Sequence, residues 1–174
     1  MRALSLWQPW AGCIAWLGKD VENRSWRCPA SVIGEQIAIH AARRVDKGRG
    51  LLAVPCPERW PELFASRAEW DAWRAHGSHR RASGDVNWPA RLPLGAVQAA
   101  ATIASCHHSD ECPGNPRACP PGLCSPWAAP CEWHWQLAGV RPLARPVPCQ
   151  GKQGLWLLPG PVEAQVRAQL AEAA

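Results

Sequence analysis

The sequence has no tyrosine, one phenylalanine and one methionine among its 174 residues, whereas tryptophan occurs 12 times. Indole rings must therefore supply nearly all of the large aromatic packing, and we expect several tryptophans to lie in the core rather than in a binding site. A chain of this length buries about two-thirds of its unfolded surface, which is enough for one core without disulfides. We therefore predict a single domain over residues 1–174.

Long apolar runs are also absent, since no stretch reaches the roughly 18 uninterrupted apolar residues of a membrane-spanning helix. Residues 3–18 resemble a signal peptide only superficially, because Gln8 and Pro9 interrupt them and no small-residue cleavage site follows. We expect a cytoplasmic protein that does not contact membranes. In that compartment the nine cysteines stay reduced or bind metal.

The net charge of the chain excludes few classes of function. Lysine and arginine together number 19 and aspartate and glutamate 14, so the net charge is +5. Such a surplus is compatible with attraction to phosphates without requiring it.

Short strands separated by turns, with few helices, make up most of the pattern. Alternation and turn residues predict strands at residues 2–6, 21–26, 36–41, 96–105, 133–137 and 154–158. Helices are predicted after Pro9, at residues 57–75 and at residues 161–173. This order favours an α+β fold, a small mixed β-barrel with an early helix, an inserted helix and a C-terminal helix. Two segments depart from it: an insertion at about 43–93 and a Cys-rich loop at about 106–131.

One charged motif follows the first predicted helix. Residues 17–24 keep Lys19, Glu22 and Arg24 of the pattern Gly-x-Lys-x-x-Glu-x-Arg, with Leu17 in place of its first glycine. This motif resembles the signature of the ASCH family, whose domains have a PUA-like β-barrel. Further blocks that look like this family lie at residues 5–10, 39–42, 126–128, 133–137 and 148–156. From spacing alone, Glu22 and Arg24 would instead be a structural ion pair beside an exposed Lys19.

The resemblance implies a cleft that binds RNA or a modified nucleoside, with DNA as a further partner and a monomeric protein. Lys19, Glu22 and Arg24 are the candidate catalytic residues. The candidate nucleic-acid-binding residues are Ser5, Trp7, Gln8, Trp10, Lys19, Arg24, His40, Arg43 and Arg44. Each tryptophan and His40 has the alternative of an ordinary structural role.

The same resemblance leaves two other functions open. One bacterial branch of the family hydrolyses N4-acetylcytidine with a lysine, a threonine three residues later and a separate glutamate, and another is a ribonuclease. Glu22 stands where the threonine would be, so a hydrolase of this kind would need an activated water. Glu111 and Glu132 are the candidates for the separate glutamate. The third hypothesis is a protein-interaction module that docks through the helix at 57–75.

The Cys-rich loop contains thiols and imidazoles that suit a structural zinc. The candidate ligands are Cys106 or His108, with Cys112, Cys119 and Cys124. Paired Cys-x-x-Cys motifs are absent, so buried or incidental thiols are the alternative. A catalytic zinc of the deaminase type is disfavoured because His108 is followed by Ser109 and Asp110 rather than by a glutamate at the second position.

Overall fold

The computed structural model describes residues 1–45, 93–112 and 122–173. Its elements, in chain order, are β1 (Arg2–Gln8), α1 (Trp10–Trp16), β2 (Val21–Arg24), η1 (Ala30–Val32), β3 (Gln36–Val45), β4 (Ala96–His108), η4 (Ser109–Glu111), β5 (Trp133–Pro148), β6 (Leu155–Leu157) and α3 (Gly160–Glu172). Every strand predicted from the sequence is present, and so are the first and last helices. The helix predicted at 57–75 lies outside the described residues.

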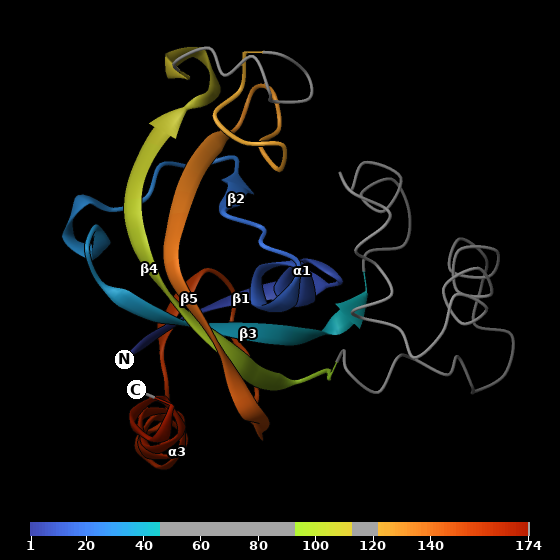
Figure 1. The fold of residues 1–174 in the computed structure, drawn as a ribbon, viewed down its shortest axis with the longest axis vertical. Coiled ribbons are helices and arrows are strands. Elements are labelled where there is room, and N and C mark those ends of the chain that lie inside the picture. The colour runs from blue at the N-terminus through green and yellow to red at the C-terminus, as the bar shows by residue number, and fades with distance from the viewer. Residues whose placement is uncertain (46–92, 113–121, 174) are drawn as a thin grey trace, which may run out of the picture.

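The strands form one mixed sheet. Its order is β2-β5-β4-β3-β1-β6, with β1 parallel to β3 and every other pair antiparallel. The long strands β4 and β5 curve through the whole molecule (Figure 1). The α+β class is therefore confirmed. Within the described ranges the sheet is open, because β2 and β6 stand at its two ends, and no closed barrel is seen there.

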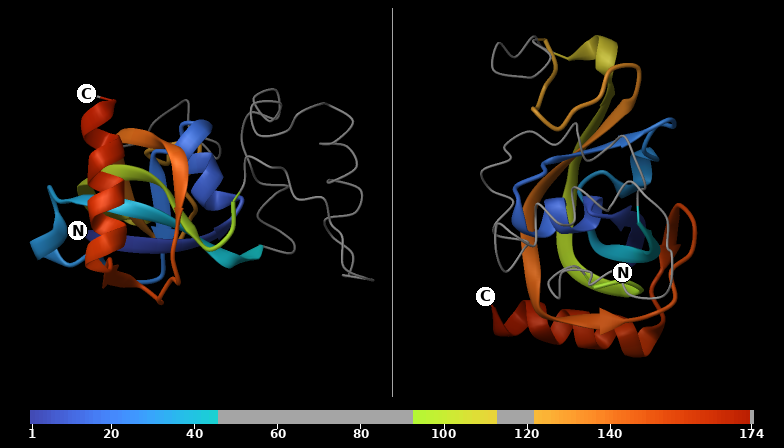
Figure 2. Two further views of the ribbon diagram at one scale, coloured as in Figure 1. Left: turned by 90° about the horizontal axis from the view of Figure 1, so that it is seen from below. Right: turned by 90° about the vertical axis from the view of Figure 1, so that its right-hand side faces the viewer.

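The central strands β1, β3 and β4 are buried on both faces over much of their length, and alternation along them decides which residues each face receives. Leu4, Ile37 and Ile39 lie on the face that packs with α1. The neighbouring Ala3, Ala38 and Ala100 lie on the face that packs with α3. Figure 2 shows α3 crossing one end of the sheet. The alanines of β4 are divided between the two faces, with Ala99 and Ala101 on the first and Ala100 on the second.

Helix α1 is short and almost wholly buried. Residues Ala11 to Ala15 have no more than slight exposure. The side chain of Gln8 accepts a hydrogen bond from the Gly12 amide at 3.1 Å, which satisfies one of the free donors of the first turn. Gly18, with φ of 70°, follows the helix in the left-handed region that glycine adopts without strain. The chain then turns directly into β2.

Strand β5 continues far beyond residue 137, where the sequence predicts its end. Pro142, Pro146 and Pro148 lie in this continuation, although proline usually interrupts interior strands. Strand β2 pairs with β5 only from Trp133 to Gln136, so beyond this point β4 is the only described strand that pairs with β5. Prolines are tolerated where one side of a strand needs no hydrogen-bond donor.

No helix in the described part of the chain is both long enough and apolar enough to cross a membrane.

Candidate functional site

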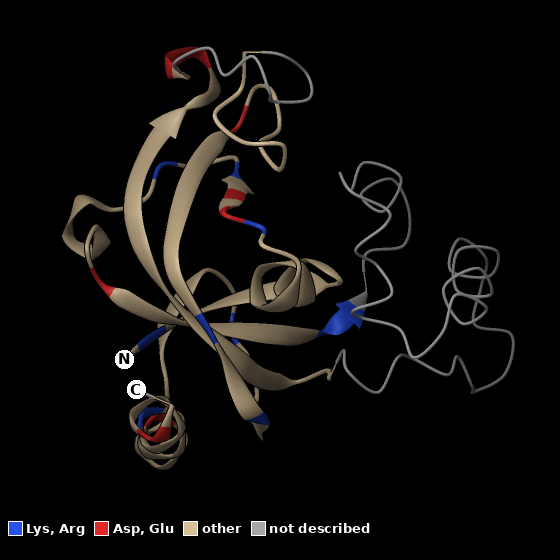
Figure 3. Cartoon of the chain, in the orientation of Figure 1, with Lys and Arg blue, Asp and Glu red and all other residues tan. Residues whose placement is uncertain are grey.

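The three charged residues of the motif meet at one point, between the end of α1 and β2. Lys19 and Glu22 are 2% and 7% exposed. The Lys19 Nζ donates to Glu22 Oε2 at 2.8 Å and to the carbonyl oxygen of Val21. Figure 3 shows charges of both signs gathered on β2 and the turn before it. Lys19 is therefore not the exposed side chain that spacing alone suggests.

Arg24 completes this group from the far end of β2. Its Nε lies 3.3 Å from Glu22 Oε1, and its Nη2 donates to the Ser5 carbonyl at 3.3 Å. The Nε–H is buried yet has no hydrogen-bond partner among the described residues. The Arg24 side chain as a whole is 22% exposed, against 2% for Lys19 and 10% for Glu22, so Arg24 is the most exposed member of the group.

The Glu22 carboxylate thus contacts two cations, Lys19 and Arg24, so the three side chains together have a net charge of +1. Lys19 Nζ also lies 5.9 Å from the centre of the Trp10 ring, within the range of a cation–π contact. Burial raises the pKa of the neighbouring Cys13 thiol to about 12, so Cys13 is a neutral thiol that does not balance the charge. A buried, incompletely compensated cation favours an anionic partner.

The residues expected to wall a cleft lie in different surroundings. Trp7 is 48% exposed, whereas Trp10 is half-buried and lies beside Lys19. Gln8 has no exposed surface, and its Nε2 donates to the Pro93 carbonyl at 3.0 Å. Gln8 therefore holds the start of α1 and cannot reach a ligand without moving.

Ser5 and His40 form a hydrogen-bonded pair in neighbouring strands. The His40 Nε2 lies 3.2 Å from the Cys149 carbonyl, which can only accept, so Nε2 carries the proton and Nδ1 accepts from the Ser5 hydroxyl at 3.1 Å. Ser5 Oγ also accepts from the Trp156 indole at 3.0 Å. Burial lowers the pKa of His40. Both side chains are fully engaged, which suits a structural role.

The remaining candidates are dispersed. Arg43 and Arg44 are exposed on β3. Glu111 accepts from the His108 amide at 3.3 Å, and Glu132 precedes β5 with a buried Oε2 that lacks a hydrogen bond among the described residues. In the described part of the chain neither glutamate forms a hydrogen bond or ion pair with the triad.

A second cluster joins the Cys-rich loop to the sheet. It consists of His107, Cys112, Cys124 and His134, whose potential ligand atoms all lie within 4.8 Å of one another, and it could hold a metal ion. Cys112 and Cys124 belong to the ligand set expected from the sequence. Cys119 lies outside the described residues.

The sequence prediction for the other ligands differs from the structure. Cys106 accepts a hydrogen bond from the Cys28 amide at 3.3 Å, and His108 lies 3.1 Å from Asp110 at the start of η4. Adjacent residues of a strand point to opposite faces, so His107 is turned toward the loop while its two neighbours are not. His107 pairs with His134 across β4 and β5, and this cross-strand pairing is the signal that would have identified both histidines.

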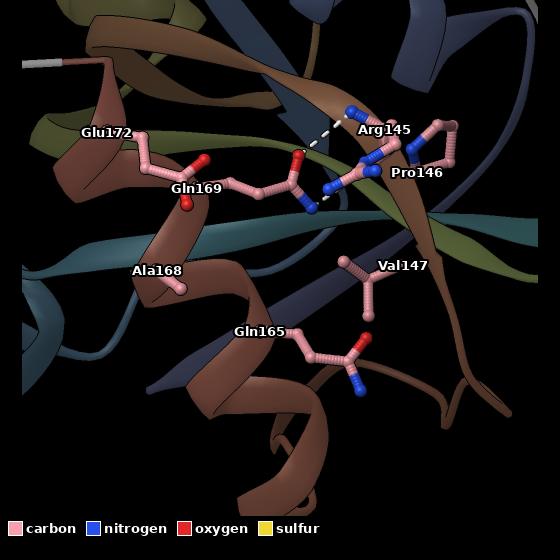
Figure 4. A pocket seen from close by; sticks show the side chains of 7 residues that line it. All are labelled: Arg145, Pro146, Val147, Gln165, Ala168, Gln169 and Glu172. Atoms are coloured by element: carbon pink, nitrogen blue, oxygen red, sulfur yellow. Dashed lines mark hydrogen bonds between the residues drawn. The ribbon is translucent and has the colours of Figure 1, made fainter.

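A shallow hollow lies apart from both clusters, between β5 and α3. Arg145, Gln169 and Glu172 are among the residues that line it (Figure 4). The Gln169 side chain bridges the Arg145 backbone through an Oε1 acceptor at 2.8 Å and an Nε2 donor at 2.9 Å. These contacts fasten α3 to the sheet and present no buried charge to a ligand.

A scan against models of known protein families finds no match, and a search of curated proteins finds no relative of this chain.

Proposed function

We propose that the protein binds RNA or a modified nucleoside at the triad of Lys19, Glu22 and Arg24. The observation that carries the proposal is that two largely buried cations share one carboxylate. A phosphate, or a carbonyl oxygen of a base, would supply the missing acceptor. Arg24 is the residue that would meet it, since its side chain is the most exposed of the three and its Nε–H lacks an acceptor among the described residues.

The ASCH resemblance supports this choice of ligand, because its signature residues are the ones that converge. A closed PUA-like barrel, a monomeric state and DNA as a second ligand belong to the same proposal. Trp10 offers an aromatic surface beside Lys19, and Trp7 is accessible on β1. Indole rings of this kind stack on bases of any sequence.

The geometry favours binding over the hydrolase alternative. Each oxygen of Glu22 faces a cation, and the Lys19 ammonium donates to two oxygens. Neither group is therefore disposed to take a proton from water. If the protein turns over an N4-acylated cytidine or RNA, the hydrolase alternative is favoured over binding alone. Chromatography of both substrates after incubation with the protein measures this turnover.

Fluorescence polarisation with a labelled single-stranded RNA, and calorimetry with cytidine 5′-monophosphate, test the binding proposal. We expect Arg24→Gln to weaken RNA binding about tenfold, which corresponds to the loss of one charge-assisted contact of about 1.4 kcal/mol. The dependence of affinity on salt should also decrease by about one phosphate contact.

Arg167→Gln is the matched control. Arg167 is an exposed arginine of α3 that pairs with Glu163, and its replacement removes the same charge from a helix that lies well away from β2 (Figure 1). Affinity unchanged by Arg24→Gln, or lowered equally by both variants, would contradict a role for the triad. The structural zinc expected in the Cys-rich loop is a separate proposal that does not depend on nucleotide binding.

A further inference from the structure

We infer that His107, Cys112, Cys124 and His134 form a tetrahedral structural zinc site that fastens the Cys-rich loop to the sheet. Cys112 Sγ lies 3.3 Å from His107 Nε2 and 3.2 Å from His134 Nδ1. Cys124 Sγ lies 3.3 Å from the same His134 Nδ1. Zinc bonds of about 2.3 Å to sulfur and 2.0 Å to nitrogen separate neighbouring ligands by roughly 3.3–3.8 Å in a tetrahedron. A small inward or outward adjustment of the side chains therefore accommodates the ion.

The protonation of His134 is already set for coordination. Its Nε2 lies 2.7 Å from the Ala129 carbonyl, and because a carbonyl only accepts, Nε2 must carry the proton. The lone pair is then on Nδ1, the atom that faces both sulfurs. A backbone carbonyl that orients a histidine in this way is the usual support of a zinc ligand.

The donor set identifies the metal and its role. Two thiolates and two neutral imidazoles around Zn²⁺ give a neutral site, which suits His134 because its side chain is fully buried. Two sulfurs with two nitrogens in a tetrahedral arrangement are typical of zinc. Four protein ligands leave no open position for water or substrate, so the site is structural rather than catalytic.

The loop needs such a fastening because it has little core. In the described part of the loop, the buried apolar side chains Leu123 and Ala128 pack on Val21 of β2 in a cluster of only three buried residues. Cys131 takes a φ of 61°, unusual for a residue other than glycine, in the same loop. Metal binding supplies the stability that a hydrophobic core of this size cannot.

The Cys-rich loop also contacts β2, the strand that carries Glu22 and Arg24 of the triad. The Asn23 side chain donates to the Trp127 carbonyl and accepts from the Ala129 amide, both at 2.9 Å. Asn23 lies between Glu22 and Arg24, and Ala129 is the residue that supports His134. Loss of the metal would therefore loosen β2 at the residues that position the two charges.

Metal content is the direct test. Protein produced with added zinc and then desalted should contain about one zinc per chain by elemental analysis. Cys112→Ser and His134→Asn should lower this content to near zero. Cys131→Ser is the control in the same loop, because Cys131 is exposed and outside the cluster, and Cys106→Ser tests the ligand set expected from the sequence. Both controls should keep the metal.

Cobalt substitution is measured on the wild-type chain, so misfolding of a variant cannot affect the result. We expect the intense visible absorption of four-coordinate cobalt together with thiolate-to-metal charge transfer. A weak six-coordinate spectrum, a substoichiometric metal content, or equal loss of zinc from Cys106→Ser and Cys112→Ser would overturn the assignment. These results test the metal site itself, and nucleotide binding is measured separately on the metal-loaded protein.

Discussion

At the scale of single residues, position 151 requires glycine because any larger side chain there would collide with the His40 ring. Gly151 approaches the His40 ring so closely that an added Cβ would lie 2.3 Å from Cε1 and 2.9 Å from Ser5 Oγ. His40 cannot retreat easily, because hydrogen bonds hold both of its ring nitrogens. We expect Gly151→Ala to lower the free energy of unfolding by about 2 kcal/mol, measured by urea denaturation.

Gly160→Ala is the comparison for this change. Gly160 begins α3 and has open space where its Cβ would be, so the substitution should leave stability unchanged or raise it slightly. Similar losses in both variants would mean that the backbone, rather than the contact with His40, sets the requirement for glycine at position 151.

His40 also makes stability depend on pH. Burial lowers its pKa in the folded state below the ordinary value of 6.5, so below that pH the unfolded chain binds the proton more readily. The contribution of His40 is therefore complete above pH ~6.5 and is lost as pH falls toward the lowered value, by at most about 1.4 kcal/mol per pH unit. Urea denaturation at several pH values between 5 and 8 measures this slope.

The variant His40→Gln isolates the effect. His107 also has a lowered pKa, caused by burial and by the nearby His134, but both proteins share that contribution. The wild type should lose more stability on acidification than the variant does. Parallel pH profiles would show that His40 does not titrate differently on unfolding.

At the scale of elements, one side chain of β2, Asn23, makes two hydrogen bonds to the Cys-rich loop. Asn23→Ala removes two hydrogen bonds at 2.9 Å, each of which contributes about 1 kcal/mol. We expect a loss of about 2 kcal/mol in the free energy of unfolding, together with faster hydrogen exchange in residues 21–24 and 125–129. Ser25→Ala, at an exposed position just beyond β2, should have little effect on either measurement.

Local pattern was sufficient to predict most elements but not their contacts. Alternation placed Glu22 and Arg24 on one face of β2 and Asn23 on the other, as the structure confirms. It could not show that Lys19 would be buried, since that depends on how α1 packs. The pairing of His107 with His134 depends on the register of β4 against β5, and sequence spacing does not specify that register.

At the scale of the whole molecule, the metal proposal predicts a large change in thermal stability. A ligand bound only by the folded state at a hundred times its dissociation constant stabilises it by about 2.7 kcal/mol. For a chain of this size that corresponds to a decrease in Tm of roughly 5–10 °C when the metal is removed. Circular dichroism melting curves with and without a chelator measure this difference.

The same chelator should leave the Tm of Cys112→Ser unchanged, because that variant has no metal to lose. A wild-type Tm that does not respond to prolonged chelation would remove the stabilising role assigned to the ion. Recovery of the original Tm on addition of zinc excludes direct damage by the chelator.

The strand order also bears on self-association. The end strands β2 and β6 are only four and three residues long, so each offers few free backbone groups to another chain. The prolines of β5 beyond Gln136 have no backbone N–H, so this part of the strand also offers few donors to another chain. Detachment of β2 would uncover the backbone edge of Trp133 to Gln136, which contains no proline, so we expect pairing with another chain to begin there.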